Sequence, residues 1–124
     1  MCHRARARSD KFAEENGLEK YGYVLHPRVT GFAHVFNEMK KNGILDCVKD
    51  VTIGYKGEGN CIPQTELDFV SGTLPEEMHF YIDRFSIDDV TNSSKDESID
   101  KEVLANWVNA RWKHKEALLK RYYF

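Results

Sequence analysis

The stretch Leu25-His-Pro-Arg-Val-Thr-Gly-Phe32 decides how the first part of the chain folds, because an extended run ends there and a helix begins. Residues 21–26 are aromatic and β-branched, which predicts a strand, and Pro27 ends it because proline has no amide donor. Beyond Thr30, apolar residues recur at the i, i+3, i+4, i+7 spacing of one helix face, at Phe32, Val35, Phe36 and Met39. Asn42-Gly43 then ends the predicted helix.

Three more helices follow from composition and capping residues. One is predicted over residues 7–16, ending at Gly17, and a shorter one over residues 63–70. A long helix begins at about Asp100, whose side chain suits an N-cap, and Ile99 and Leu104 have the spacing of a hydrophobic staple. The apolar side of this helix consists of Val103, Leu104, Trp107, Val108, Leu118 and Tyr122.

Two more strands are predicted, at residues 47–55 and 78–85, and the polar residues 88–98 between strand and last helix favour a flexible loop. In the first strand one face holds Val51, Ile53 and Tyr55; in the second, Met78, Phe80 and Ile82 alternate with His79, Tyr81 and Asp83. This order predicts an α/β fold: a mixed sheet with some parallel pairing, flanking helices and a long C-terminal helix.

Composition and charge exclude some functions. The 124 residues carry a net charge of −2, with an acidic middle and basic ends, so no basic stripe for nucleic acid is present. The basic ends suit anionic headgroups, or they are simply solvated. Neither a secretory signal nor a run of about 18 apolar residues occurs, so this chain by itself should not cross a bilayer. Cys2, Cys47 and Cys61 fit reduced thiols facing the cytosol, and no spacing indicates a metal site.

The turn at residues 27–31 is the candidate binding site. Free amides at a helix N-terminus favour an anion, Arg28 offers a guanidinium that grips phosphate in bidentate fashion, and Gly31 permits close backbone approach. The alternative is that Arg28 is a surface ion-pair partner and Thr30 only a helix cap. Paired acids at 76–77 and 88–89 are interpreted as solvated loop charges, and His114 as an exposed residue of a charged helix.

Several motifs resemble the glycerol-phosphate acyltransferase family, in its lysocardiolipin and plant-type lysophosphatidate acyltransferase branch. They are Ala7-Arg-Ser-Asp-Lys-Phe-Ala-Glu-Glu-Asn-Gly-Leu18, Tyr23-Val-Leu-His-Pro-Arg28, Thr30-Gly-Phe32, Asp50-Val-Thr-Ile-Gly-Tyr55, Ile62-Pro-Gln-Thr-Glu66 and the segment 107–122. The resemblance implies that residues 7–124 are the C-terminal part of an acyltransferase domain and that residues 1–6 are an atypical start. Val29 departs from the family, which usually has threonine there.

The resemblance implies transfer of a fatty acyl group from acyl-CoA, as co-substrate, to a lysophospholipid, with no other cofactor and no metal. It implies that Pro27, Arg28, Thr30 and Gly31 line the acceptor site. His26, just before the proline, is a further candidate for substrate binding, and the alternative is that it caps a strand. The family's base belongs to a His-x-x-x-x-Asp motif, and a Glu-Gly-Thr motif helps to hold the phosphate; neither occurs in these 124 residues. We therefore expect no catalytic residue here, and association with the endoplasmic reticulum membrane through segments that this chain lacks.

Three hypotheses remain open from the sequence. The chain is part of a membrane-bound lysophospholipid acyltransferase, or a non-catalytic module that binds anionic lipid or a partner, or a soluble protein of unrelated role. If the chain is part of a larger domain, its sheet lacks the first strands, and we expect an open edge, an uncovered apolar face and poor solubility in isolation.

Overall fold

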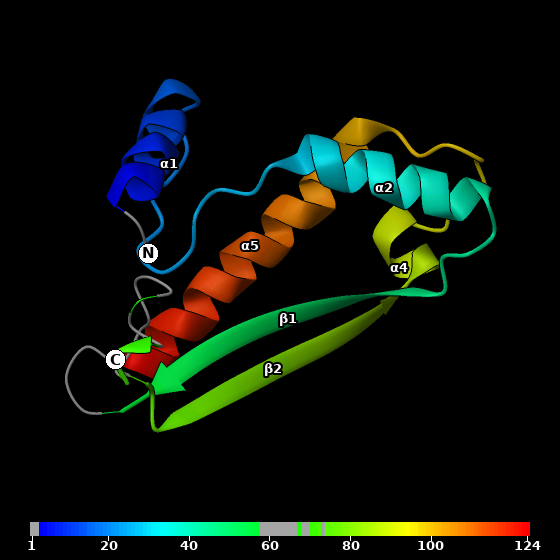
Figure 1. Cartoon of the computed structure of the whole chain (residues 1–124). Helices are drawn as coiled ribbons and strands as arrows, with labels where there is room; N and C mark the ends of the chain where they lie inside the picture. The colour runs from blue at the N-terminus through cyan, green and yellow to red at the C-terminus, as the bar shows by residue number, and fades with distance from the viewer. Residues whose placement is uncertain (1–2, 58–66, 68–69, 73) are drawn as a thin grey trace. The chain divides into compact units, whose positions relative to one another are not determined.

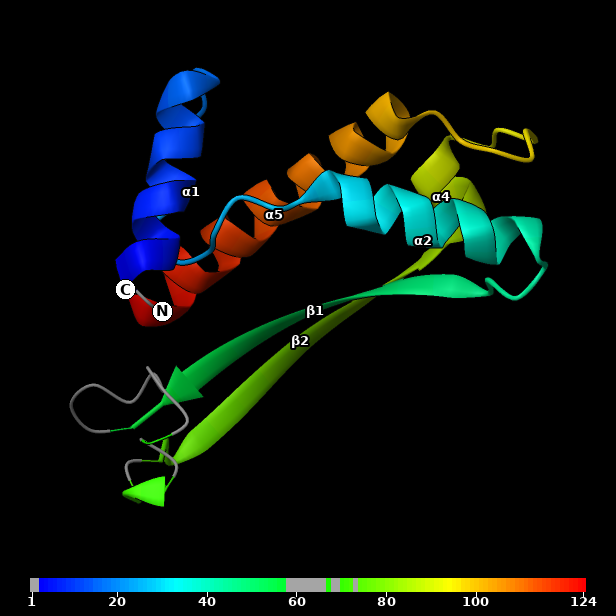
Figure 2. The same cartoon turned by 45° about the horizontal axis from the view of Figure 1, so that its top comes forward.

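The chain forms four helices and two strands in the part that its structure, a computed structural model, describes: residues 3–57, 67, 70–72 and 74–124. These elements are α1 His3–Glu15, α2 Val29–Lys41, β1 Cys47–Lys56, β2 Glu77–Ser86, α4 Ile87–Thr91 and α5 Lys101–Tyr123, where α4 is a single short turn of helix (Figure 1). The predicted α/β class is confirmed. Within the described residues β1 and β2 pair antiparallel, as Figures 1 and 2 show, whereas we expected some parallel pairing.

Two compact units divide the chain, and each is described by itself. Unit 1 consists of residues 1–26, 52–81 and 116–124, and unit 2 consists of residues 27–51 and 82–115, so that each strand and α5 contribute to both. The predicted helix at residues 63–70 falls mostly outside the described residues, as do Cys2 and Cys61. Cys47 is a free thiol.

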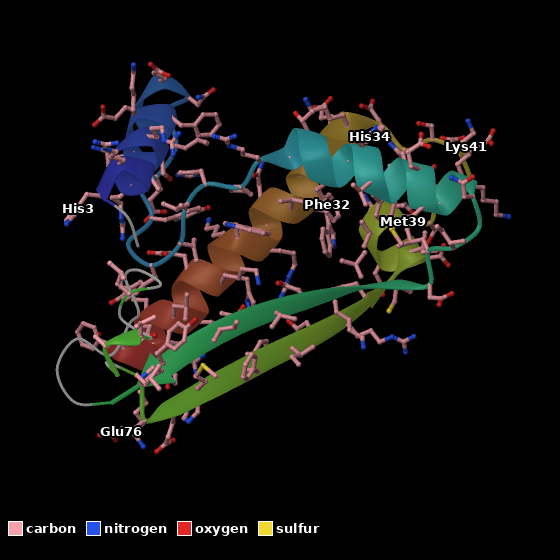
Figure 3. All side chains as sticks on the ribbon, viewed as in Figure 1. His3, Phe32, His34, Met39, Lys41 and Glu76 are labelled. Atoms are coloured by element: carbon pink, nitrogen blue, oxygen red, sulfur yellow. The ribbon has the colours of Figure 1, made fainter. Side chains whose placement is uncertain are left out.

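The core of unit 2 lies where α2, α4 and α5 pack, and it is built from Ala33, Phe36, Val90, Ile99 and Leu104. Phe32, at its edge, stacks on Trp107 with ring centroids 5.8 Å apart, and Trp107 meets Phe85 edge-on at 5.3 Å (Figure 3). The predicted stripe on α2 is correct for Phe36 but wrong for Val35, which is 54% exposed. Ala33 is buried instead, so the packed face is rotated toward it.

The end of β2 leads directly into α4, where we had predicted a loop. Ser86 and Asp89 form a capping box: the Asp89 amide donates to Ser86 Oγ at 3.2 Å and the Ser86 amide donates to Asp89 Oδ2 at 2.9 Å. This satisfies helix amides that would otherwise be unpaired, and a polar sequence therefore forms a helical turn. The Ser86 hydroxyl lowers the pKa of Asp89.

The helices at the two ends of the chain largely follow the prediction. α1 begins earlier than expected and ends at Glu15, and the nearby Gly17 has a φ of +62°, which belongs to a left-handed C-terminal cap. Asp100 Oδ1 accepts the Glu102 amide at 3.1 Å, which confirms the predicted N-cap of α5. None of the described helices is both long enough and apolar enough to cross a bilayer.

The strand predicted at residues 21–26 is wrong. This segment of unit 1 is irregular, and its amides are satisfied by side chains instead of a neighbouring strand. The Glu116 carboxylate accepts the amides of Gly22, Tyr23 and Val24 at 2.5, 2.8 and 3.1 Å. A single carboxylate thus replaces the hydrogen bonds that a sheet would have provided.

The apolar faces of the two strands are exposed. β1 buries Asp50, Thr52 and Gly54, while Val51 and Ile53 are 42% and 37% exposed. On β2 the apolar residues Met78, Phe80 and Ile82 are all more than half exposed. The apolar alternation therefore located the strands correctly. The buried face of β1 is the one that carries the charge and the small residues described below.

Candidate functional site

The residues predicted to bind substrate fall in both units. His26 belongs to unit 1, where its amide donates to Ser9 Oγ at 2.9 Å and its ring stacks on Tyr21 with centroids 4.4 Å apart. His26 Nε2 lies 2.9 Å from the Glu19 carbonyl oxygen, so this nitrogen carries the proton and donates. The imidazole is therefore part of the packing of the segment after α1.

Pro27, Arg28, Thr30 and Gly31 belong to unit 2, at the start of α2. Arg28 is the N-cap residue; its side chain makes no capping hydrogen bond, is exposed, and has no ion-pair partner among the described residues. The alternative role for this turn is therefore unsupported in both of its parts. Arg28 forms no ion pair with a described residue, and Thr30 lies inside α2 instead of capping it. A Cβ added to Gly31 would meet no atom within 4 Å. The space beside Gly31 is therefore open.

Four charged side chains form a cluster in unit 2 that sequence reasoning did not find. Arg111 Nε donates to Asp50 Oδ2 at 2.7 Å, and Arg111 Nη2 donates to Asp83 Oδ2 at 2.6 Å. Lys115 Nζ contacts Asp50 Oδ1 and donates to the Val51 carbonyl oxygen at 2.7 Å. The side chains of Asp50 and Lys115 are 6% and 9% exposed.

This cluster has a structural role. Its two carboxylates and two cations balance, which a buried charge requires, because removing it from water costs several kcal/mol per ion unless it is paired. Arg111 and Lys115 are four residues apart, which places both cations on one face of α5. This spacing was the sequence signal that could have indicated the cluster. Both cations are paired with Asp50, and Arg28, which the sequence predicts to bind phosphate, is not part of this cluster.

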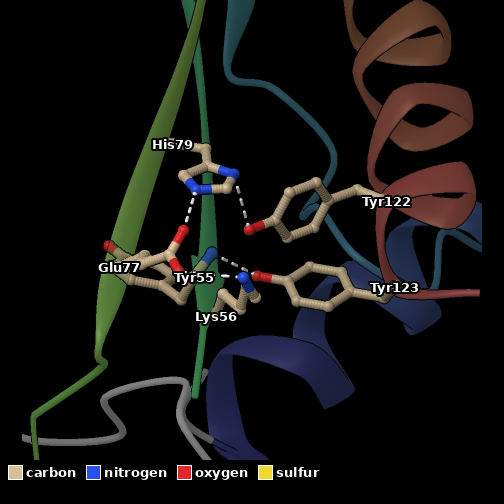
Figure 4. A network of polar contacts seen from close by, with 6 residues as sticks. All are labelled: Tyr55, Lys56, Glu77, His79, Tyr122 and Tyr123. Atoms are coloured by element: carbon tan, nitrogen blue, oxygen red, sulfur yellow. Dashed lines mark hydrogen bonds and ion pairs between the residues drawn. The ribbon is translucent and has the colours of Figure 1, made fainter.

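A second chain of polar contacts lies in unit 1 and is drawn in Figure 4. Lys56 Nζ donates to Glu77 Oε1 at 2.8 Å, Glu77 Oε2 lies 2.7 Å from His79 Nε2, and the Tyr122 hydroxyl lies 3.1 Å from His79 Nδ1. Nearby, the Tyr55 amide donates to the Tyr123 hydroxyl at 2.8 Å. The interpretation of Glu77 as a loop charge was wrong, since it is the first residue of β2.

The hydrogen bonds define the protonation pattern of this chain of contacts. A carboxylate only accepts, so His79 Nε2 carries a proton, and in the neutral imidazole Nδ1 then accepts from the Tyr122 hydroxyl. The Lys56 ammonium, followed by His79, lowers the pKa of Glu77. Glu77 and His79 are two residues apart, which places both on one face of β2. Reciprocally, the hydrogen bond with Glu77 raises the pKa of Lys56.

A groove lies beside these polar residues in unit 1. It has a volume of about 260 Å³ and is lined by residues of β1, β2 and α5, among them His79 and Tyr122. The structure explains why residue 54 is a glycine, because a Cβ at this position would lie 2.8 Å from the Tyr122 ring. The ring therefore lies directly against the backbone of β1, and a larger residue would displace it.

Comparison with known proteins identifies the class. Residues 68–124 match the family described as Acyltransferase C-terminus. Over 95% of its length the chain is 43% identical to lysocardiolipin acyltransferase 1 of Gallus gallus, and over 94% it is 38% identical to lysophosphatidylinositol acyltransferase 10 of Caenorhabditis elegans. It is also 38% identical, over 94%, to the probable 1-acyl-sn-glycerol-3-phosphate acyltransferase 5 of Arabidopsis thaliana.

The resemblance inferred from the motifs is thus confirmed: along most of its length the chain is similar to glycerol-phosphate and lysophospholipid acyltransferases. It spans only 29%, 27% and 28% of the lengths of those three relatives. No solved structure matches it.

Proposed function

We propose that the chain is part of an acyltransferase that moves a fatty acyl group from acyl-CoA to the hydroxyl of a lysophospholipid, in phospholipid biosynthesis or remodelling. The observation that carries the proposal is the similarity to lysophospholipid acyltransferases along 94–95% of the chain. The acceptor is of the 1-acyl-glycerol-3-phosphate or lysocardiolipin type, and the setting is the membrane of the endoplasmic reticulum.

Within that reaction the turn from Pro27 to Gly31 forms a wall of the acceptor's phosphate site. Arg28 supports this assignment because its guanidinium is exposed and has no ion pair among the described residues. The open amides at the start of α2 add a second attraction for the phosphate, and Gly31 leaves space for it.

The chain's part in the reaction is binding. Acyl transfer requires a base within hydrogen-bond reach of the acceptor hydroxyl, whose oxygen then attacks the thioester carbonyl while the CoA thiolate leaves. No His-x-x-x-x-Asp motif occurs in the 124 residues. We therefore assign no catalytic residue to them.

Binding to vesicles tests the phosphate site. Phosphatidylcholine vesicles containing 1-oleoyl-lysophosphatidic acid should bind the chain, and Arg28→Ala should weaken this binding at least fivefold in a flotation assay. Lys41→Ala is the matched control, because it removes one exposed positive charge at the opposite end of the same helix. Equal binding by Arg28→Ala and the unaltered chain would exclude the phosphate wall.

A second candidate function is a non-catalytic fragment that binds anionic lipid or a partner protein. The open helix start without a catalytic motif favours it equally, since lipid binding needs only the turn. The two candidates differ in what a longer protein containing this chain does. Joined to a segment with the missing motif, the chain should support acyl transfer under the first candidate and not under the second.

A further inference from the structure

We propose that the groove of unit 1 binds the alkyl chain of a lipid, with the lipid's polar end at the Lys56–Glu77–His79–Tyr122 edge. The inference rests on the proposed function, which makes the acyl chain of the substrate the natural occupant, and it extends that function by adding a site for the chain itself. It requires only residues of unit 1, whereas the phosphate wall belongs to unit 2.

Most of the lining of the groove is apolar. β1 provides Thr52 and Gly54, β2 provides Tyr81, and α5 provides Leu118 and Leu119. Thr52 and Gly54 occupy the buried face of β1, and the Tyr122 ring lies against Gly54. The groove therefore lies beside this ring, among residues of β1, β2 and α5.

An exposed aromatic residue along the groove points to an apolar ligand. Tyr81 lines the groove and is 48% exposed. Apolar surface in contact with water is unfavourable, so a ligand that covers this ring gains binding free energy. The volume of about 260 Å³ is slightly below the range of about 300 Å³ and more that is usual for drug-sized ligands, which favours a narrow chain.

The polar residues lie at one edge of the groove, so the ligand must be an amphiphile. His79 and Tyr122 line the groove, and through Glu77 they connect to the exposed ammonium of Lys56. Lys56 uses one of its donors on Glu77, which leaves others for an anionic group, and its raised pKa keeps it cationic at neutral pH. When the His79 imidazole is neutral, the Tyr122 hydroxyl donates to it, and the hydroxyl oxygen can accept a further hydrogen bond.

An alkyl chain can come from the acyl acceptor, from the acyl donor or from a free fatty acid. Three oleoyl compounds separate these sources: 1-oleoyl-lysophosphatidic acid, oleoyl-CoA and oleate, each below its micellar concentration. Glycerol 3-phosphate and CoA serve as the corresponding controls without a chain. Displacement of a fluorescent fatty acid measures binding. We expect the oleoyl compounds to displace the probe and the two controls to leave it bound; the tightest of the three identifies the source.

A groove-filling substitution localises the site. Leu118→Trp should weaken oleate binding at least tenfold, because the indole occupies the space of the alkyl chain. Val35→Trp adds the same indole to an exposed position of unit 2 and should leave the affinity unchanged. Equal affinity for Leu118→Trp and the unaltered chain would overturn the proposal, as would displacement of the probe by glycerol 3-phosphate.

Methyl NMR of the unaltered chain keeps the proposal testable if Leu118→Trp misfolds. Oleate should shift the methyl resonances of Leu118 and Leu119 and leave those of Leu104, in the core of unit 2, in place. Shifts confined to other methyl groups would contradict the site, and so would a dimer that buries Leu118 and excludes oleate. Arg28→Ala separates the two proposals: if it binds vesicles normally while Leu118→Trp loses oleate, the phosphate wall fails and the groove stands.

Discussion

The inward face of β1 serves opposite purposes in the two units. In unit 2 it carries Asp50, a buried charge paired with two cations of α5, and in unit 1 it carries Thr52 and Gly54, which line a groove beside the Tyr122 ring. A buried ion pair fixes one arrangement because any slip leaves a charge unpaired, while small residues leave volume without fixing it. The comparison teaches that polar or small residues facing inward on a strand mark either a charge cluster or a site.

Removal of the Asp50 carboxylate tests the charge cluster of unit 2. Asp50→Ala leaves the buried Lys115 and the partly buried Arg111 without their shared partner, which should lower the free energy of unfolding by about 3–5 kcal/mol. Urea denaturation followed by circular dichroism measures the loss. Asp46→Ala, at an exposed position just before β1, should change the stability by less than about 0.5 kcal/mol. Similar losses for both variants would show that the cluster does not hold unit 2 together.

Glu116 offers a sharper contrast, because this carboxylate of unit 1 is paired with backbone amides instead of cations. Glu116→Ala removes the acceptor of three amides and should cost about 1–3 kcal/mol. Amide hydrogen exchange of Gly22, Tyr23 and Val24 should accelerate while that of α2 stays slow. Unchanged exchange at these three amides would mean that other groups satisfy them.

The smallest expected effect is the pH dependence at the edge of the groove. The pKa of Glu77 is lowered from its ordinary value of 4.5, so its interaction stabilises the fold fully above that value and is lost as the pH falls through the lowered pKa. The thermal midpoint of the unaltered chain should therefore exceed that of Glu77→Gln at pH 7, and the difference should shrink toward pH 3. A difference that grows on acidification would contradict the ion pair.

Helices could be predicted from the sequence because their signals are local. The spacing of Phe32 and Phe36, the cap at Asp100 and the stop at Gly17 each act within one or two turns. The capping box at Ser86 was equally local and could have been found from its spacing.

The strand faces could not be predicted in the same way. The burial of Asp50 depends on Arg111, 61 residues away, and no periodicity of β1 contains that information. The segment at residues 21–26 has strand composition, yet Glu116, more than ninety positions later, supplies its hydrogen bonds. The turn from Pro27 to Gly31 could be proposed as a site from sequence motifs. The groove could not, because its walls come from three separate segments of the chain.

Acyl transfer by the purified chain tests the central claim most directly, namely that these residues bind lipid and leave the chemistry to a motif they do not contain. Radiolabelled oleoyl-CoA and lysophosphatidic acid are incubated with the chain in phosphatidylcholine vesicles, and the labelled phosphatidic acid is counted against vesicles alone. We predict that the chain binds the vesicles and forms no product above that background. Product that increases in proportion to the amount of chain would contradict the account.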